Sequence, residues 1–126
     1  NIIARTDIVM APYQKKIHIA SGADISRWIS PLKLFEYMAL GKPIVVSDIP
    51  VLHEVLTDQK NALFVEPDSI DEWVSAITKL ADDKGLRQRF GEEAKELIVQ
   101  KYSWVSRAEK ITDFILSSMP VHAQRP

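Results

Sequence analysis

The chain has 126 residues, of which 46% are hydrophobic and 26% are charged, and its formal net charge is −1. This composition is typical of a soluble globular domain, and it excludes the strongly basic surface that nucleic-acid binding requires. The absence of cysteine excludes disulfide and thiolate chemistry and favours a cytoplasmic location.

No window of the sequence is long and apolar enough for a membrane span, and the N-terminus lacks a signal-peptide pattern. We therefore expect a cytoplasmic protein, with peripheral attachment of the parent protein to a membrane as an open option. The chain starts at Asn1 without an initiator methionine, which predicts a fragment of a longer protein. We expect residues 1–118 to form part of one domain and residues 119–126 to be a disordered tail.

Three short apolar runs predict buried strands. The first, residues 7–12, ends at a proline; residues 44–46 are β-branched throughout, and residues 62–65 form the third. The segment 13–29 is longer than an ordinary connection. We interpret it as a solvated loop, with a place on the sugar or acceptor side of a cleft as the alternative. Its histidine, His18, has no second ligand at metal spacing, so we expect no metal site.

The second half of the chain is predicted to be helical. Asp68 or Ser69 caps a first helix, with Ser69 and Glu72 in the pattern of a capping box, and Ser103 caps the last. The apolar residues at helical spacing, which we expect to be buried, are Ile70, Trp73, Val74, Ile77, Leu80 and Ala81 in the first helix, Leu86, Phe90, Ala94, Leu97 and Ile98 in the second (84–101), and Trp104, Ala108, Ile111 and Ile115 in the third. Strands that alternate with helices predict an α/β fold with a short parallel sheet of about three strands.

Residues 30–47 predict a capped helix, a tight stop and a buried strand. Ser30 can accept a hydrogen bond from a first-turn amide, and Pro31 at the first helical position loses no needed donor. Gly41 suits the left-handed residue just past a helix end, and Pro43 prevents the helix from continuing.

This pattern also predicts an anion site. The free amides of Leu32 and Lys33 at a helix N-terminus beside a parallel sheet favour a bound anion. Glu36 follows one turn later, within reach of whatever carries that anion. The alternative is structural: an exposed ion pair between Glu36 and Lys33, with water capping the amides.

The segment SPLKLFEYMALGKPIVVSDIPVLHEVL (residues 30–56) resembles the donor-binding segment of retaining glycosyltransferases of the GT-B fold. The similarity extends from about Thr6 to Trp104. It implies the second half of a C-terminal Rossmann-like, three-layer domain, in which the helix N-terminus faces the donor diphosphate and Glu36 holds the ribose hydroxyls. The family often has a second glutamate eight residues before Glu36, and this chain has Trp28 there.

The resemblance implies a function in sugar transfer from a nucleotide-diphosphate sugar of the UDP or GDP type, without a further cofactor. The acceptor, a glycan or a lipid-linked glycan, would bind a missing N-terminal domain, and the catalytic residues would also lie in the missing part. We therefore expect the chain to be inactive alone. The nucleotide-sugar-binding residues implied are Ser30, Pro31, Leu32, Lys33 and Glu36.

Two other functions stay open. The chain can be a non-catalytic nucleotide-binding module, which Trp28 favours, or a helical interaction module, which the C-terminal helices favour. We also expect the chain to self-associate, either by edge pairing of the strand at 7–12 or by exchange of a terminal helix, because an unpaired strand beside apolar surface recruits partners.

Overall fold

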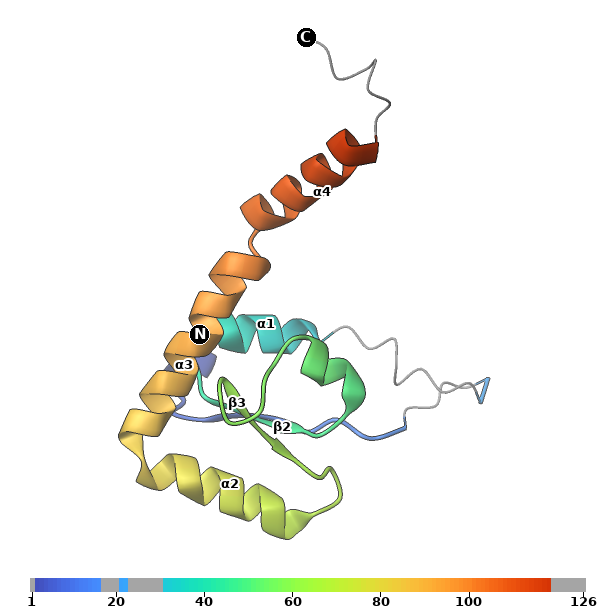
Figure 1. Cartoon of the computed structure of the whole chain (residues 1–126). Coiled ribbons are helices and arrows are strands. Elements are labelled where there is room, and N and C mark those ends of the chain that lie inside the picture. The colour runs from blue at the N-terminus through green and yellow to red at the C-terminus, as the bar shows by residue number, and fades with distance from the viewer. Residues whose placement is uncertain (1, 17–20, 23–30, 119–126) are drawn as a thin grey trace.

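The computed structural model describes residues 2–16, 21–22 and 31–118. Its centre is a parallel sheet of three strands in the order β1 (Val9–Ala11), β2 (Ile44–Ser47) and β3 (Ala62–Val65) (Figure 1). All three predicted strands are confirmed. Every residue of β2 is buried, as its uninterrupted apolar sequence requires for a central parallel strand.

Helices cover both faces of the sheet, which makes the predicted three layers (Figure 1). The helix α1 (Leu32–Ala39) and the 3-10 helix η3 (Pro50–Glu54) pack on one face, and α2 (Ile70–Asp82) packs on the other. The long helix α3 (Lys84–Lys101) contributes to both cores, through Ala94 to the first and Phe90 to the second. A second 3-10 helix, η1 (Ile3–Arg5), precedes β1.

The C-terminal end of α1 has the predicted stop. Gly41 has a φ of +63°, and its N–H donates to Met38 O while the N–H of Lys42 donates to Tyr37 O, which is a Schellman motif. The same turn touches α3 backbone to backbone, because a Cβ on Gly91 would lie 2.0 Å from Gly41 O. The ammonium of Lys42 also donates to Ala4 O and Thr6 O, at 2.8 and 2.7 Å.

The start of α1 differs by one residue from the prediction. Pro31 is the N-cap rather than the first helical residue, because its ψ of 57° is not helical. Its carbonyl accepts the Leu34 N–H at 2.9 Å, and no side chain of a described residue caps the helix. Ser30, the predicted cap, lies outside the described residues, as do most of the predicted loop at 13–29 and the predicted tail at 119–126.

The predicted cap of α2 is present in part. Ser69 Oγ accepts the Glu72 N–H at 3.4 Å, but the Glu72 carboxylate accepts the Glu66 N–H at 2.7 Å instead of completing a capping box with Ser69. Asp83 caps α3 by accepting the Leu86 N–H at 2.8 Å. The bounds predicted for α3 are confirmed.

The apolar face predicted for α2 is partly wrong. Ile70 and Val74 are 77% and 57% exposed, and Ala81 is exposed as well. The residues that reach the core are Trp73, Ala76, Ile77 and Leu80. The predicted face was too wide for the narrow strip of β3 and β2 that α2 covers, so the residues at its margin remain in solvent.

The last helix, α4 (Trp104–Ser118), is present with its predicted cap, because Ser103 Oγ accepts the Ser106 N–H at 3.1 Å. The prediction that its apolar face is buried is wrong. Trp104 is 83% exposed and Ile111 is 53% exposed, and α4 projects away from the rest of the molecule (Figure 1). The periodicity of a sequence shows that a helix is amphipathic, but it does not show whether another element packs against its apolar face.

Candidate functional site

The predicted site lies at the carboxyl end of the parallel strands. After β1 the chain continues through Pro12 and Tyr13, and α1 begins at the same edge of the sheet. A hollow of about 470 Å³ opens there, and its lining residues come from β1, the segment that follows it and the first turns of α1: Met10, Ala11, Pro12, Tyr13, Leu32, Lys33 and Tyr37. In open α/β sheets, ligands bind at this edge.

The first turn of α1 presents unpaired backbone donors to this hollow. Leu32 is 69% exposed, Lys33 is also exposed, and no described residue accepts a hydrogen bond from either amide. Pro31 is buried at the cap. The positive end of the α1 dipole and two N–H groups without an acceptor among the described residues therefore lie at the opening, which is the arrangement that binds phosphate oxygens.

Glu36 lies one turn further along α1, exposed and beside the hollow rather than in its lining. Its carboxylate has no hydrogen bond or ion pair with any described residue, so the structural alternative, an ion pair with Lys33, is not formed. The carboxylate is free to accept hydrogen bonds from a ligand.

A tyrosine pair, which the sequence did not single out, forms the wall of the hollow. The backbone N–H of Tyr13 donates to the hydroxyl of Ser47, at 2.8 Å, and Ser47 is fully buried at the end of β2. Burial raises the pKa of the Tyr13 phenol, and the neighbouring Tyr37 raises it further. The Tyr13 hydroxyl is therefore neutral at pH 7. A serine as the last residue of a buried, otherwise β-branched strand was the signal available in the sequence.

An ion pair and a histidine–carboxylate contact lie at the same edge of the sheet. Lys15 pairs with Glu66, which follows β3, and this hydrogen bond raises the pKa of the Lys15 ammonium. The Nε2 atom of His53 lies 2.6 Å from an oxygen of Asp48, and the His53 ring stacks on Phe64 with centroids 4.1 Å apart. These contacts fix the segments that follow β1 and β2.

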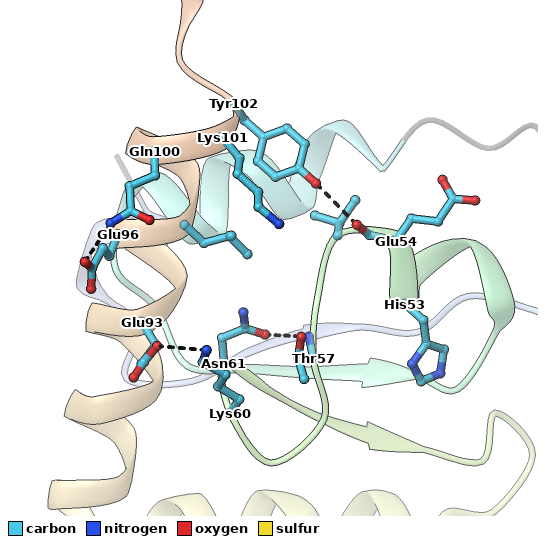
Figure 2. A pocket seen from close by; sticks show the side chains of 12 residues that line it. His53, Glu54, Thr57, Lys60, Asn61, Glu93, Glu96, Gln100, Lys101 and Tyr102 are labelled. Atoms are coloured by element: carbon cyan, nitrogen blue, oxygen red, sulfur yellow. Dashed lines mark hydrogen bonds and ion pairs between the residues drawn. The ribbon is translucent and has the colours of Figure 1, made fainter. Parts of the chain in front are cut away.

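A second hollow, of about 360 Å³, is separate from this site. It lies between the segment 53–61 and the C-terminal half of α3 (Figure 2). None of the predicted site residues lines it. We call it the α3 pocket.

Some sequence-based hypotheses fall outside the described part of the chain. Ser30, Trp28 and His18 cannot be placed. Among residues 2–16, 21–22 and 31–118, no group of three or more His, Cys, Asp or Glu side chains is arranged to hold a metal ion. Within the same ranges, every helix is too short or too polar to cross a membrane.

Comparison with known proteins gives relatives of one kind. A segment of 45 residues is 53% identical to the O-antigen chain mannosyltransferase RfbU of Salmonella typhimurium, covering 36% of this chain and 12% of that protein. A longer match, 31% identical over 98 residues, covers 73% of this chain and 25% of an uncharacterized glycosyltransferase of Methanocaldococcus jannaschii. The chain thus spans a quarter or less of the length of these relatives.

The fold has a counterpart among solved structures. The crystal structure of HepE from Anabaena in complex with UDP matches with a TM-score of 0.74 and 18% identity, over 94% of this chain and 29% of that one. This likeness establishes a Rossmann-like portion of a GT-B fold. The family model named Glycosyl transferases group 1 matches residues 30–97, more than half of the chain and the whole of the segment that builds α1 and β2. The chain therefore belongs to the group 1 glycosyl transferases.

Proposed function

We propose that this chain is the donor-binding part of an enzyme that moves a sugar from a nucleotide-diphosphate sugar, of the UDP or GDP type, to a glycan or lipid-linked acceptor. The observation that carries the proposal is the start of α1, where two amides open on a hollow and a carboxylate lies one turn away, none of them paired with a described residue. The relatives support the class of reaction, because RfbU is a mannosyltransferase and HepE was crystallised with UDP.

The geometry suggests a division of roles. The Leu32 and Lys33 amides hydrogen-bond the diphosphate and stabilise the charge that builds on it as the sugar departs. Glu36 accepts hydrogen bonds from the two ribose hydroxyls. We assign no general acid or base to any residue of this chain.

The Glu36→Gln variant tests this assignment. We expect binding of UDP to the chain, without added divalent metal, to weaken about tenfold in the variant, since a hydrogen bond to a charged group contributes roughly 1.5–3 kcal/mol when shielded and less when exposed. Binding of inorganic diphosphate should not change, because it has no ribose. Calorimetric titration of both ligands measures the difference.

The matched control is Glu109→Gln on α4, which removes the same charge from an exposed helix far from the α1 amides. It should leave the affinity for both ligands unchanged. Equal losses of UDP and diphosphate affinity in Glu36→Gln would remove Glu36 from the ribose.

We also propose that the chain alone does not transfer sugar. Catalysis by positioning requires both reactants to be held, and this chain matches 12% to 25% of the relatives reported above. Release of UDP from UDP-glucose, or of GDP from GDP-mannose, by the purified chain would contradict the proposal.

Each of the two alternative functions has one observation in its favour. The residue Trp28, where the family often has a sugar-contacting glutamate, favours a nucleotide-binding module without catalysis. The exposed apolar residues of α4, among them Trp104 and Phe114, favour a helical interaction module. UDP titration separates the second alternative from the other two functions, because only it expects no binding.

We further propose that the chain self-associates along β1. In the described residues β1 has a neighbour on one side only, and Met10 at its centre is 51% exposed. Strand edges of this kind recruit further strands.

A further inference from the structure

The α3 pocket is lined mainly by polar side chains and shares no lining residue with the hollow at the start of α1. One wall is the segment 57–61, which leads into β3, and the opposite wall is the last two turns of α3 (Figure 2). Its volume of about 360 Å³ falls at the lower end of the range of small-molecule sites.

The Asn61 side chain lines this pocket. Asn61 is only 3% exposed, and its Oδ1 accepts the backbone N–H of Thr57 at 2.8 Å. Because only the oxygen of an amide can accept that hydrogen, the orientation of the side chain is determined. The Nδ2 group therefore faces the pocket (Figure 2), and no described residue accepts a hydrogen bond from it.

A cation approaches the same space from the other wall. The Lys101 side chain extends from the end of α3 into the pocket (Figure 2), and its ammonium forms no ion pair with a described residue. The Nζ atom of Lys60, by contrast, lies 4.0 Å from Oε2 of Glu93. Two donor groups, an ammonium and an amide, thus converge on one space.

Each carboxylate around the pocket either has a donor beside it or is turned away. Glu93 faces Lys60, and Glu96 accepts a hydrogen bond from Gln100 at 2.8 Å. The Glu54 carboxylate points away from the pocket, while its backbone carbonyl accepts the Tyr102 hydroxyl at 3.3 Å (Figure 2). The centre of the pocket therefore presents donors, and acceptors are left at its rim.

We propose that the α3 pocket binds a monosaccharide-sized ligand that carries one acidic group, a phosphate or a carboxylate. Lys101 Nζ and Asn61 Nδ2 donate hydrogen bonds to the oxyanion, which supplies the acceptors that both groups lack. The remaining volume is too large for an inorganic ion, and sugar hydroxyls, which both donate and accept, match the carboxylates and amides of the rim. The neighbouring glutamates keep the affinity modest.

The experiment is an NMR titration of the whole 126-residue chain with glucose 6-phosphate, following the Asn61 side-chain amide resonance. Parallel titrations use glucuronate, glucose and inorganic phosphate. We expect glucose 6-phosphate and glucuronate to shift the Asn61 resonance with similar affinity, because they share the acidic group and the ring. Glucose and phosphate alone should each bind at least tenfold more weakly.

Two variants locate the ligand. Lys101→Met and Asn61→Asp should each lower the affinity at least tenfold. Asn61→Asp keeps the oxygen that accepts the Thr57 N–H but lacks the side-chain amide, so its titration follows the Thr57 backbone amide resonance. Lys110→Met on α4, which removes the same charge from an exposed position, should change nothing. A far-UV circular dichroism spectrum like that of the parent chain would show that Lys101→Met folds, and this control does not depend on the proposed α1 site.

Three results would overturn the proposal. The first is an Asn61 resonance that no probe shifts, which would mean that the pocket holds only water. The second is equal weakening by Lys101→Met and Lys110→Met, which would indicate unspecific attraction. The third is phosphate binding as tight as that of glucose 6-phosphate, which would leave no role for the sugar.

Discussion

Gly91 is the position at which the packing of two helices leaves no room for a side chain. A Cβ there would lie 2.0 Å from the carbonyl oxygen of Gly41, so Gly91→Ala must push α3 away from α1. We expect a loss of about 1–3 kcal/mol or more in the free energy of unfolding, as for other overpacked sites. Urea denaturation followed by circular dichroism measures it.

Gly85 provides the control on the same helix. A Cβ there approaches only the Asp83 side chain, at 3.4 Å, and alanine is the better helix former by up to about 1 kcal/mol. Gly85→Ala should therefore be neutral or stabilising. A similar loss in both variants would contradict this, because it would mean that the approach to Gly41 does not set the cost.

At the scale of single residues, the sequence predicted those whose role is local. Gly41 ends its own helix, and the positions of Leu32, Lys33 and Glu36 follow from where that helix starts. Asn61 and Tyr13 could not be found in this way. The partner of Tyr13 is Ser47, 34 residues away, and Asn61 matters through a pocket whose other wall is α3.

Among the elements, α3 depends on a cap that also ends α2. Asp83 accepts the Leu86 N–H at 2.8 Å, whereas Ser69 holds the corresponding bond of α2 at 3.4 Å. We expect Asp83→Ala to lower the free energy of unfolding by about 1 kcal/mol and Ser69→Ala to lower it less. Thermal and urea unfolding of the two variants tests the order.

The variant Asp83→Asn separates capping from charge, because asparagine caps a helix as well as aspartate does. It should retain most of the stability that alanine loses. If Asp83→Asn and Asp83→Ala were equally destabilised, the contribution would come from the charge at the helix dipole.

The sequence predicted where helices and strands occur more successfully than it predicted which of their residues are buried. The β-branched run of β2 and the spacing of Phe90 and Ala94 in α3 gave the correct location and the correct buried face. For α4 the same periodicity identified the helix and misplaced it in the core. A buried face needs a second surface, and the sequence of a helix specifies only its own.

At the scale of the molecule, the two edges of the sheet differ. The outer edge of β3 is closed by its own neighbours, since Asp58 accepts the Phe64 N–H at 2.9 Å and the Gln59 N–H donates to Ala62 O at 2.9 Å. On β1 the Val9 N–H donates inward to Pro43 O, so the backbone groups of Met10 point outward. Self-association should therefore use β1.

Met10→Lys tests this edge. A charge on an exposed edge strand discourages pairing, so the variant should be a folded monomer in sedimentation velocity at concentrations where the parent chain associates. Val9→Lys should instead unfold the chain, because Val9 is only 7% exposed. The control is Val99→Lys on α3, at an exposed position away from the sheet, which should associate like the parent. A parent chain that stays monomeric at tens of micromolar would contradict the proposal.

The two ends of α1 are held very differently, and this has a thermodynamic consequence. The C-terminal end is fixed by the Schellman turn, the approach of Gly91 and the two bonds from Lys42. The N-terminal end has no side-chain cap among the described residues. We therefore expect fraying mainly at the end where the proposed ligand binds, so a bound diphosphate would supply acceptors for two amides that have none among the described residues. Part of the binding free energy would be used to order Leu32 and Lys33, so the binding would have an unfavourable entropy contribution from these residues.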